Sequence, residues 1–281
     1  MPELSKALRN QLKRNESKNL LHAQVEQLLE IDPTFLAALE ELLADAKASP
    51  ANFNLDEIAA DAASSFIDKI YAINQYIQID NSAKQFLRQI YIQSWQKLSE
   101  TRDIESTLRN DHYPRIRDFL TNLYPRSLAE AIQFSPTLNR VPCSEYSAEL
   151  QIRLFRLDLS TIHQPVLDIG CGSQANLVTY LRSRHIEAFG MDRIIKQKSD
   201  YLMETDWFEM RLGSNQWGTV LSNLSFANHL VYTQRYEPNH VPRYLRKYQE
   251  ILGSLLPGGT FIYAPDVESL EGQTRPEKFH T

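Results

Sequence analysis

The stretch Val166-Leu167-Asp168-Ile169-Gly170-Cys171-Gly172-Ser173-Gln174-Ala175 places a short, mostly apolar run directly before two glycines. A run of this kind predicts a buried strand, a tight turn and a following helix. Glycines at such a turn allow a ligand to lie against bare backbone. By spacing alone, Gly170, Gly172 and Ala175 fit the dinucleotide pattern G-x-G-x-x-G/A. A tight turn that binds no ligand is the alternative.

The sequence after this turn alternates short apolar runs with helical or loop segments. Short buried strands separated by helices predict an α/β fold with a doubly wound, mostly parallel, Rossmann-like sheet. Before the first strand, a helix is expected to begin near Ser144, with Leu150, Leu154 and Leu157 facing inward. The predicted strands are residues 165–169, 187–191, 200–203, 219–224 and 260–263.

The first half of the chain has a different pattern. All nine glycines lie between Gly170 and Gly272. The earlier part shows amphipathic helical spacing, with helix-start signals at Asp32-Pro33 and at residues 54–57. We therefore predict an N-terminal all-helical domain over residues 1–141, serving as lid, substrate module or dimer surface, and an α/β domain over residues 142–281.

Composition excludes several classes of protein. The net charge is −5 and neither half is basic, so a nucleic-acid-coating surface is not indicated. The two cysteines form no disulfide framework, and no metal-ligand spacing is present, so no metal site is expected. The chain shows neither a signal-peptide pattern nor a run of about 18 apolar residues. A cytoplasmic protein without a membrane partner is the expectation.

Several acidic residues follow the predicted strands. Asp192 lies 20 residues after Gly172, where an acid is placed to accept hydrogen bonds from ribose hydroxyls. From Ser144 to Asp266 the sequence resembles the class I S-adenosylmethionine-dependent methyltransferases. The family's first motif, D/E-x-G-x-G, is matched by Asp168, Gly170, Cys171 and Gly172. Its fourth motif resembles residues 217–226, which include Asn223, and residues 255–260 are similar to the turn into its fifth strand.

The resemblance implies S-adenosylmethionine as the cofactor and assigns roles to individual residues. It implies that Asp168 helps to hold the methionine end and that Asp192 binds the ribose. It implies that Asp206 and Trp207 contact the adenine, while Tyr146 closes over the methionine end. The sequence departs from the family pattern at Gln174 and at Gly218-Thr219, where a glycine and an acid are common. Only 15 residues follow Asp266, so we expect a short sheet, a covered sheet edge or a truncated chain.

Three functions remain open from the sequence. The first is methyl transfer to a small-molecule or protein acceptor, with a possible homodimer. The second is a non-catalytic cofactor-binding or regulatory module, and the third is a nicotinamide-dependent oxidoreductase. His229 is the candidate catalytic base, and packing against the sheet is the alternative for it. We also predict that Gly172→Ala blocks the ligand without disturbing the fold, and that Asp192→Ala and Asp206→Ala weaken binding without unfolding the protein.

Overall fold

The computed structural model of the chain describes residues 2–50, 53–135, 140–142 and 145–271. It divides into two compact units, Met1–Pro142 and Cys143–Thr281, and we describe each unit by itself. No helix among the described residues has the length and apolar character needed to cross a membrane.

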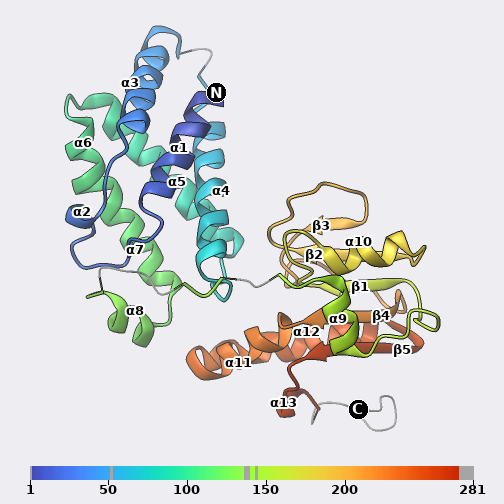
Figure 1. Ribbon diagram of the computed structural model, residues 1–281. Coiled ribbons are helices and arrows are strands. Elements are labelled where there is room, and N and C mark those ends of the chain that lie inside the picture. Colours follow the sequence, from blue (N-terminus) through green and yellow to red (C-terminus); the bar gives the residue numbers. More distant parts are fainter. Residues whose placement is uncertain (1, 51–52, 136–139, 143–144, 272–281) are drawn as a thin grey trace. The chain divides into compact units, whose positions relative to one another are not determined.

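The described residues of the first unit form helices and connecting segments (Figure 1). Side chains of Asp32, Asn54 and Asp80 accept backbone N–H groups at the starts of three long helices, which satisfies donors that a helix end leaves free. The helices are α1 (Pro2–Arg14), α2 (Val25–Leu28), α3 (Pro33–Ala48), α4 (Leu55–Ile73), α5 (Asn81–Glu100), α6 (Ile104–Thr107), the π-helical turn η2 (Leu108–His112), α7 (Tyr113–Leu123) and α8 (Arg126–Ile132).

The second unit contains the expected α/β fold. Its sheet has five strands in the order β3-β2-β1-β4-β5, all parallel. The elements are α9 (Ala148–Phe155), β1 (Val166–Ile169), α10 (Asn176–Ser183), β2 (Ala188–Asp192), β3 (Leu202–Glu204), β4 (Trp217–Asn223), α11 (Phe226–Tyr236), the 3₁₀ turn η3 (Pro238–His240), α12 (Val241–Ser254), β5 (Leu255–Ala264) and α13 (Glu268–Glu271).

The strand order reverses between β1 and β4. Both strands are central in the sheet, and the chain runs outward from them in opposite directions. In open parallel sheets the crevice at the carboxyl ends of such a strand pair is where ligands bind. The loop after β1 and the end of β4 at Asn223 both lie at this edge.

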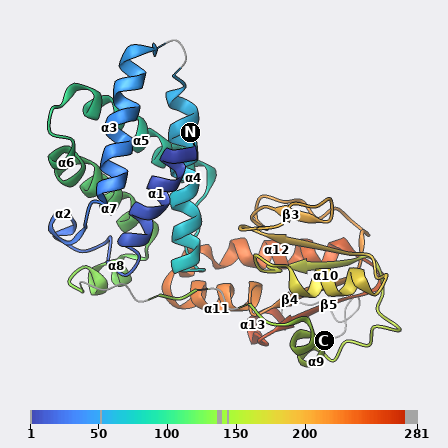
Figure 2. The ribbon, with the colours of Figure 1, turned by 45° about the horizontal axis from the view of Figure 1, so that its top comes forward.

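Helices cover both faces of the sheet (Figures 1 and 2). On one face, Leu167, Ile169 and Val220 pack with apolar residues of α11 and α12. On the other face, Val166 and Leu221 pack with α9 and α10. The central strands are thus buried on both sides, which explains why their sequences are nearly continuous apolar runs.

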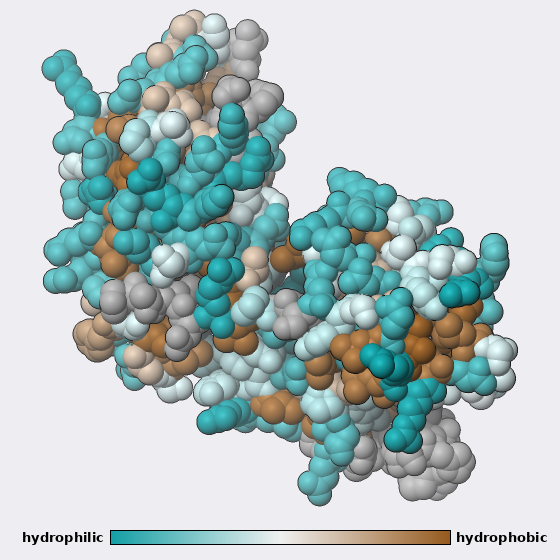
Figure 3. Space-filling view, in the orientation of Figure 1, coloured by the Kyte–Doolittle hydropathy of each residue, from teal (hydrophilic) through white to brown (hydrophobic). Residues whose placement is uncertain are grey.

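The structure corrects the expected orientation of α9. Its buried residues are Ala148, Gln151 and Phe155, whereas Leu150 and Leu154 are 41% and 52% exposed. Figure 3 shows the hydrophobic area over this helix. Both sets of residues have the same helical spacing, so periodicity alone could not decide between the two faces.

The fifth strand begins earlier than the sequence indicated. The register between β4 and β5 shifts after the pair Trp217–Leu255 and resumes at Thr219–Thr260. Gly258, within the intervening segment, has φ +77°, a conformation that glycine adopts without steric cost. The turn expected at residues 255–260 is therefore an irregularity inside the strand.

Candidate functional site

The glycine loop connects β1 to α10 and is held by backbone hydrogen bonds. Gly170 N and Cys171 N both donate to Met191 O on the neighbouring strand, at 2.9 and 3.1 Å. Gly170 and Gly172 have φ values of +75° and +78°. In this left-handed region a side chain is strained, so both glycines have a conformational reason for their presence.

A side chain added at either glycine would also meet a neighbouring side chain. A Cβ on Gly170 would overlap Ser225, whose hydroxyl donates to Ile169 O at 2.7 Å. A Cβ on Gly172 would lie 3.5 Å from Cγ of Glu145. The expectation that Gly172→Ala affects the ligand alone is therefore wrong, because the positive φ strains any side chain at 172 with or without a ligand.

Asp192 ends β2 and fixes the second half of the loop. Its Oδ2 accepts from Gly172 N at 3.0 Å, and its Oδ1 accepts from Ile194 N at 3.1 Å. Burial raises the pKa of this carboxyl, against the opposing effect of the backbone N–H groups. Asp192→Ala would leave two backbone donors without acceptors, so its effect is not confined to ligand binding as expected from the sequence.

Asp168 lies at the same edge and is 1% exposed. Among the described residues, neither carboxylate oxygen has a hydrogen-bond partner. Burial, followed by the nearby charge of Asp192, raises the pKa of Asp168 to about 7. A buried carboxylate that no protein group compensates is costly, and such sites frequently serve a ligand.

Glu145 contacts the glycine loop, although no sequence pattern indicated a role for it. Its Oε1 accepts from Ser173 N at 3.0 Å and from Ser173 Oγ at 2.5 Å. The next residue, Tyr146, is fixed through its carbonyl, which accepts from the side-chain amides of Gln151 and Asn176, each at 3.1 Å. The structure thus brings the predicted Tyr146 to the start of α10, with Glu145 beside it.

Cys171 contributes its backbone to the loop and its side chain to the core. The thiol is buried in the cluster that packs α10 against the sheet. Its Sγ lies against Gly190 of β2, where an added Cβ would approach it to 2.8 Å. Burial raises the pKa of the thiol well above its usual value, with further increases from the charges of Asp168, Asp192 and Glu145. The Cys171 side chain is therefore a packing group rather than a ligand-binding one.

Asp206 and Trp207 follow β3 in two different environments. Asp206 is half-buried, and its Oδ1 accepts from Phe208 N at 2.8 Å. Trp207 is 7% exposed and belongs to the core, yet its ring comes within 3.5 Å of the position that a Cβ on Gly170 would take. Trp207 therefore borders the glycine loop, while most of its ring packs inside the protein, and its contact with an adenine stays a prediction.

Asn223 is the last residue of β4, and His229 lies on α11, which follows it. Asn223 is half-buried, and within the described part of the chain its Oδ1 has no partner. His229 is 3% exposed, and its ring packs edge-on against Trp207 with centroids 4.9 Å apart. Burial lowers the pKa of His229 well below its usual value, so the ring is neutral at pH 7. This burial favours the packing alternative for His229 over the role of a base.

The site is electrically negative where the glycine loop meets the strand ends. Three carboxylates from separate segments, those of Asp168, Asp192 and Glu145, each raise the pKa of the Cys171 thiol. Arg193 adds a positive charge that lowers the pKa of Asp192. The described residues contain no group of three or more His, Cys, Asp or Glu side chains arranged to hold a metal ion. The carboxylates are suited to hydroxyl donors and to a cationic group.

No protein-family model matches this sequence, and no curated protein matches it.

Proposed function

We propose that the second unit binds S-adenosylmethionine and transfers its methyl group to an acceptor. The observation that carries this proposal is the buried, unpartnered carboxylate of Asp168 beneath the glycine loop. An amino group of a ligand would provide the positive charge and hydrogen-bond donors that the protein does not supply.

The other contacts of the cofactor follow from the same edge of the sheet. Asp192 has one backbone donor on each oxygen, and a carboxylate has lone pairs for further donors, so ribose hydroxyls can bind there. Asp206 and Trp207 would contact the adenine. When bound, the sulfonium supplies an activated methyl group, and the protein's part is to align the acceptor and exclude water.

The electrostatics of the loop argue against a nicotinamide cofactor. A dinucleotide would place its pyrophosphate at the start of α10, where helix N–H groups usually bind anions. Here Glu145 already accepts from Ser173 at this position, and Asp168 lies beneath the loop. Two carboxylates would repel a pyrophosphate and attract a cation.

A non-catalytic S-adenosylmethionine-binding or regulatory module is the second candidate. The burial of His229 favours it, because the one base suggested by the sequence packs against Trp207. Both candidates use the same binding site and differ only in turnover. We further propose that the protein is cytoplasmic and that its acceptor is a small molecule or a protein. The proposal also includes an N-terminal all-helical domain over residues 1–141 and a possible homodimer.

Thermal unfolding with added ligands tests this proposal. We expect S-adenosylhomocysteine to stabilise the full chain by about 2.7 kcal/mol at a hundredfold excess over its dissociation constant. NAD⁺ at the same concentration should leave the unfolding temperature unchanged. Stabilisation by NAD⁺ alone would replace the proposal with the oxidoreductase alternative.

A further inference from the structure

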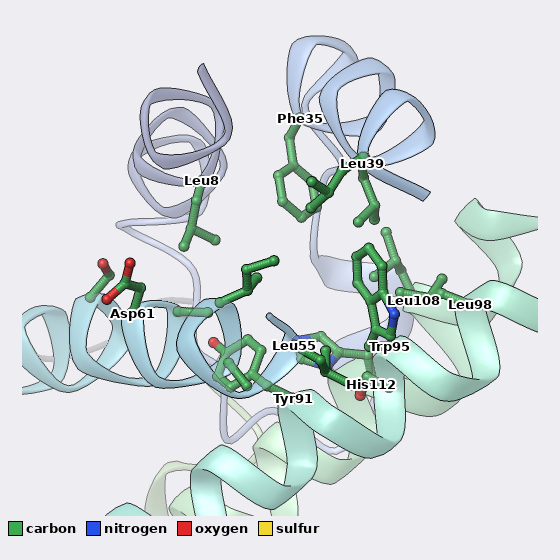
Figure 4. Close-up of a pocket in the computed structure, with 16 residues that line it drawn as sticks. Leu8, Phe35, Leu39, Leu55, Asp61, Tyr91, Trp95, Leu98, Leu108 and His112 are labelled. Carbon is green, nitrogen blue, oxygen red and sulfur yellow. The ribbon is translucent and has the colours of Figure 1, made fainter. Parts of the chain in front are cut away.

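The first unit contains a cavity of about 120 Å³ that the proposed cofactor site does not involve. It lies among α1, α3, α4, α5 and the π-helical turn η2 (Figure 4). Leu8, Phe35 and Leu39 supply part of its apolar lining. An engineered apolar cavity of about 150 Å³ remains dry and binds benzene, so this volume is suited to a single ring.

Tyr91 and His112 interrupt the apolar lining with polar groups. His112 Nδ1 lies 2.9 Å from Ser94 Oγ, which leaves Nε2 as its second hydrogen-bonding atom. Both side chains are partly buried, and both contribute polar atoms, the Tyr91 hydroxyl and the His112 ring, to the lining of the cavity. Both residues also line an adjoining cavity of about 100 Å³. Polar groups of this kind usually fix the orientation of a ligand in a pocket that is otherwise apolar.

The two polar rings face the cavity as uncharged groups. Burial lowers the pKa of His112 to about 4 and raises the pKa of Tyr91. A charged ligand would therefore find no opposite charge on either ring. Asp61, which is exposed and also lines the cavity, further disfavours an anion. The lining thus disfavours an anion, and the two neutral rings suit an uncharged molecule.

The backbone that carries His112 is unusual at this point. Residues Leu108–His112 form a π-helical turn between α6 and α7. Both Leu108 and His112, at the ends of this turn, line the cavity. Single π-helical turns are rare and occur frequently at functional sites. The turn therefore supports a binding role independently of the two polar side chains.

We propose that this cavity binds a small uncharged molecule with one aromatic ring and one hydroxyl, of which phenol is the simplest example. The ring fills the apolar part, and the hydroxyl bonds with Tyr91 and His112. A hydroxyl suits both tautomers of His112, because it donates to an unprotonated Nε2 and accepts from a protonated one. An apolar ring alone would offer neither polar group a hydrogen bond.

Calorimetric titration of the full chain with phenol and with toluene tests the proposal. We expect saturable one-to-one binding of phenol, with a dissociation constant on the order of 1 mM or tighter. Tyr91→Phe should weaken phenol binding about tenfold, the effect of one lost hydrogen bond, and leave toluene binding unchanged. Toluene thereby reports whether the cavity itself is intact in the variant.

Tyr124→Phe is the matched control, because Tyr124 is a buried tyrosine of the same unit that lines neither cavity. It should bind phenol as the parent chain does. Absence of saturable phenol binding to the parent chain would overturn the proposal, as would equal losses of phenol and toluene in Tyr91→Phe. The measurement uses no cofactor, so its outcome is independent of the proposed methyl transfer.

Discussion

Asp168→Asn is expected to stabilise the ligand-free protein at pH 8 and to abolish binding of S-adenosylhomocysteine. The pKa of Asp168 is raised to about 7, so its folded state favours the protonated carboxyl. The stabilisation that comes from the protonated carboxyl is fully present below about pH 4, the pKa of an aspartate in the unfolded chain. It is lost as the pH rises through 7. At pH 8 the buried carboxylate costs on the order of 4 kcal/mol, and we expect the variant to recover about 2–4 kcal/mol in the free energy of unfolding.

Denaturant unfolding at pH 8, together with calorimetry, measures both effects. Asp200→Asn is the control, since Asp200 is exposed on the same unit, and it should change neither quantity. A destabilised Asp168→Asn protein would show that Asp168 has a structural partner. An unchanged affinity for S-adenosylhomocysteine would remove Asp168 from the binding site. Loss of function accompanied by gained stability is the pattern of a residue retained for its ligand.

The second large effect is a loss of folding stability at low pH that protonation of His112 causes. Burial lowers the pKa of His112 to about 4, so the folded state favours the neutral ring. This stabilisation is present above the unfolded pKa of about 6.5 and is lost as the pH falls through 4. Nearby Asp111 raises the pKa and Arg115 lowers it, and burial outweighs both. Between pH 7 and pH 4 the free energy of unfolding of the parent chain should fall by about 2–3 kcal/mol more than that of the His112→Gln variant.

Denaturant unfolding at pH 7 and pH 4 provides the comparison. Gln at position 112 retains a hydrogen-bonding group for Ser94 and cannot titrate. Titration of Asp168 changes the free energy of unfolding in the opposite direction over this pH range. Both chains contain Asp168, so its effect cancels in the difference between the parent chain and His112→Gln. His163→Gln, at an exposed position, should follow the parent chain. Identical pH dependences for the parent and His112→Gln would contradict the burial of a neutral ring.

Local patterns predicted much of the second unit. The apolar runs became β1 to β5. For the central strands β1 and β4 the reason is burial on both faces, which requires apolar residues throughout. The glycine pair marked a turn with two positive φ values. Asp192 and Asp168 reached the expected edge because parallel strands all end on the same side of the sheet.

Features that depend on tertiary packing were not predictable. The exposure of Leu150 and Leu154 depends on which of two equal helical stripes meets the sheet. The contact of Glu145 with Ser173 joins segments 28 residues apart, and no local pattern indicates it. Burial of His229 against Trp207 likewise depends on how α11 packs. The cavity at Tyr91 is a property of several helices together.

The pH dependence of ligand affinity tests whether an ionised Asp168 binds the amino group of the cofactor. S-adenosylhomocysteine carries an amino group, and 5′-methylthioadenosine contains the same adenosine without it. If Asp168 is ionised beside that amino group, calorimetry should show the affinity for S-adenosylhomocysteine falling about 100-fold between pH 8 and pH 5, because the carboxyl must release its proton. The affinity for 5′-methylthioadenosine should change little over the same range. Failure of S-adenosylhomocysteine to bind at pH 8, or the same pH dependence for both ligands, would contradict the account.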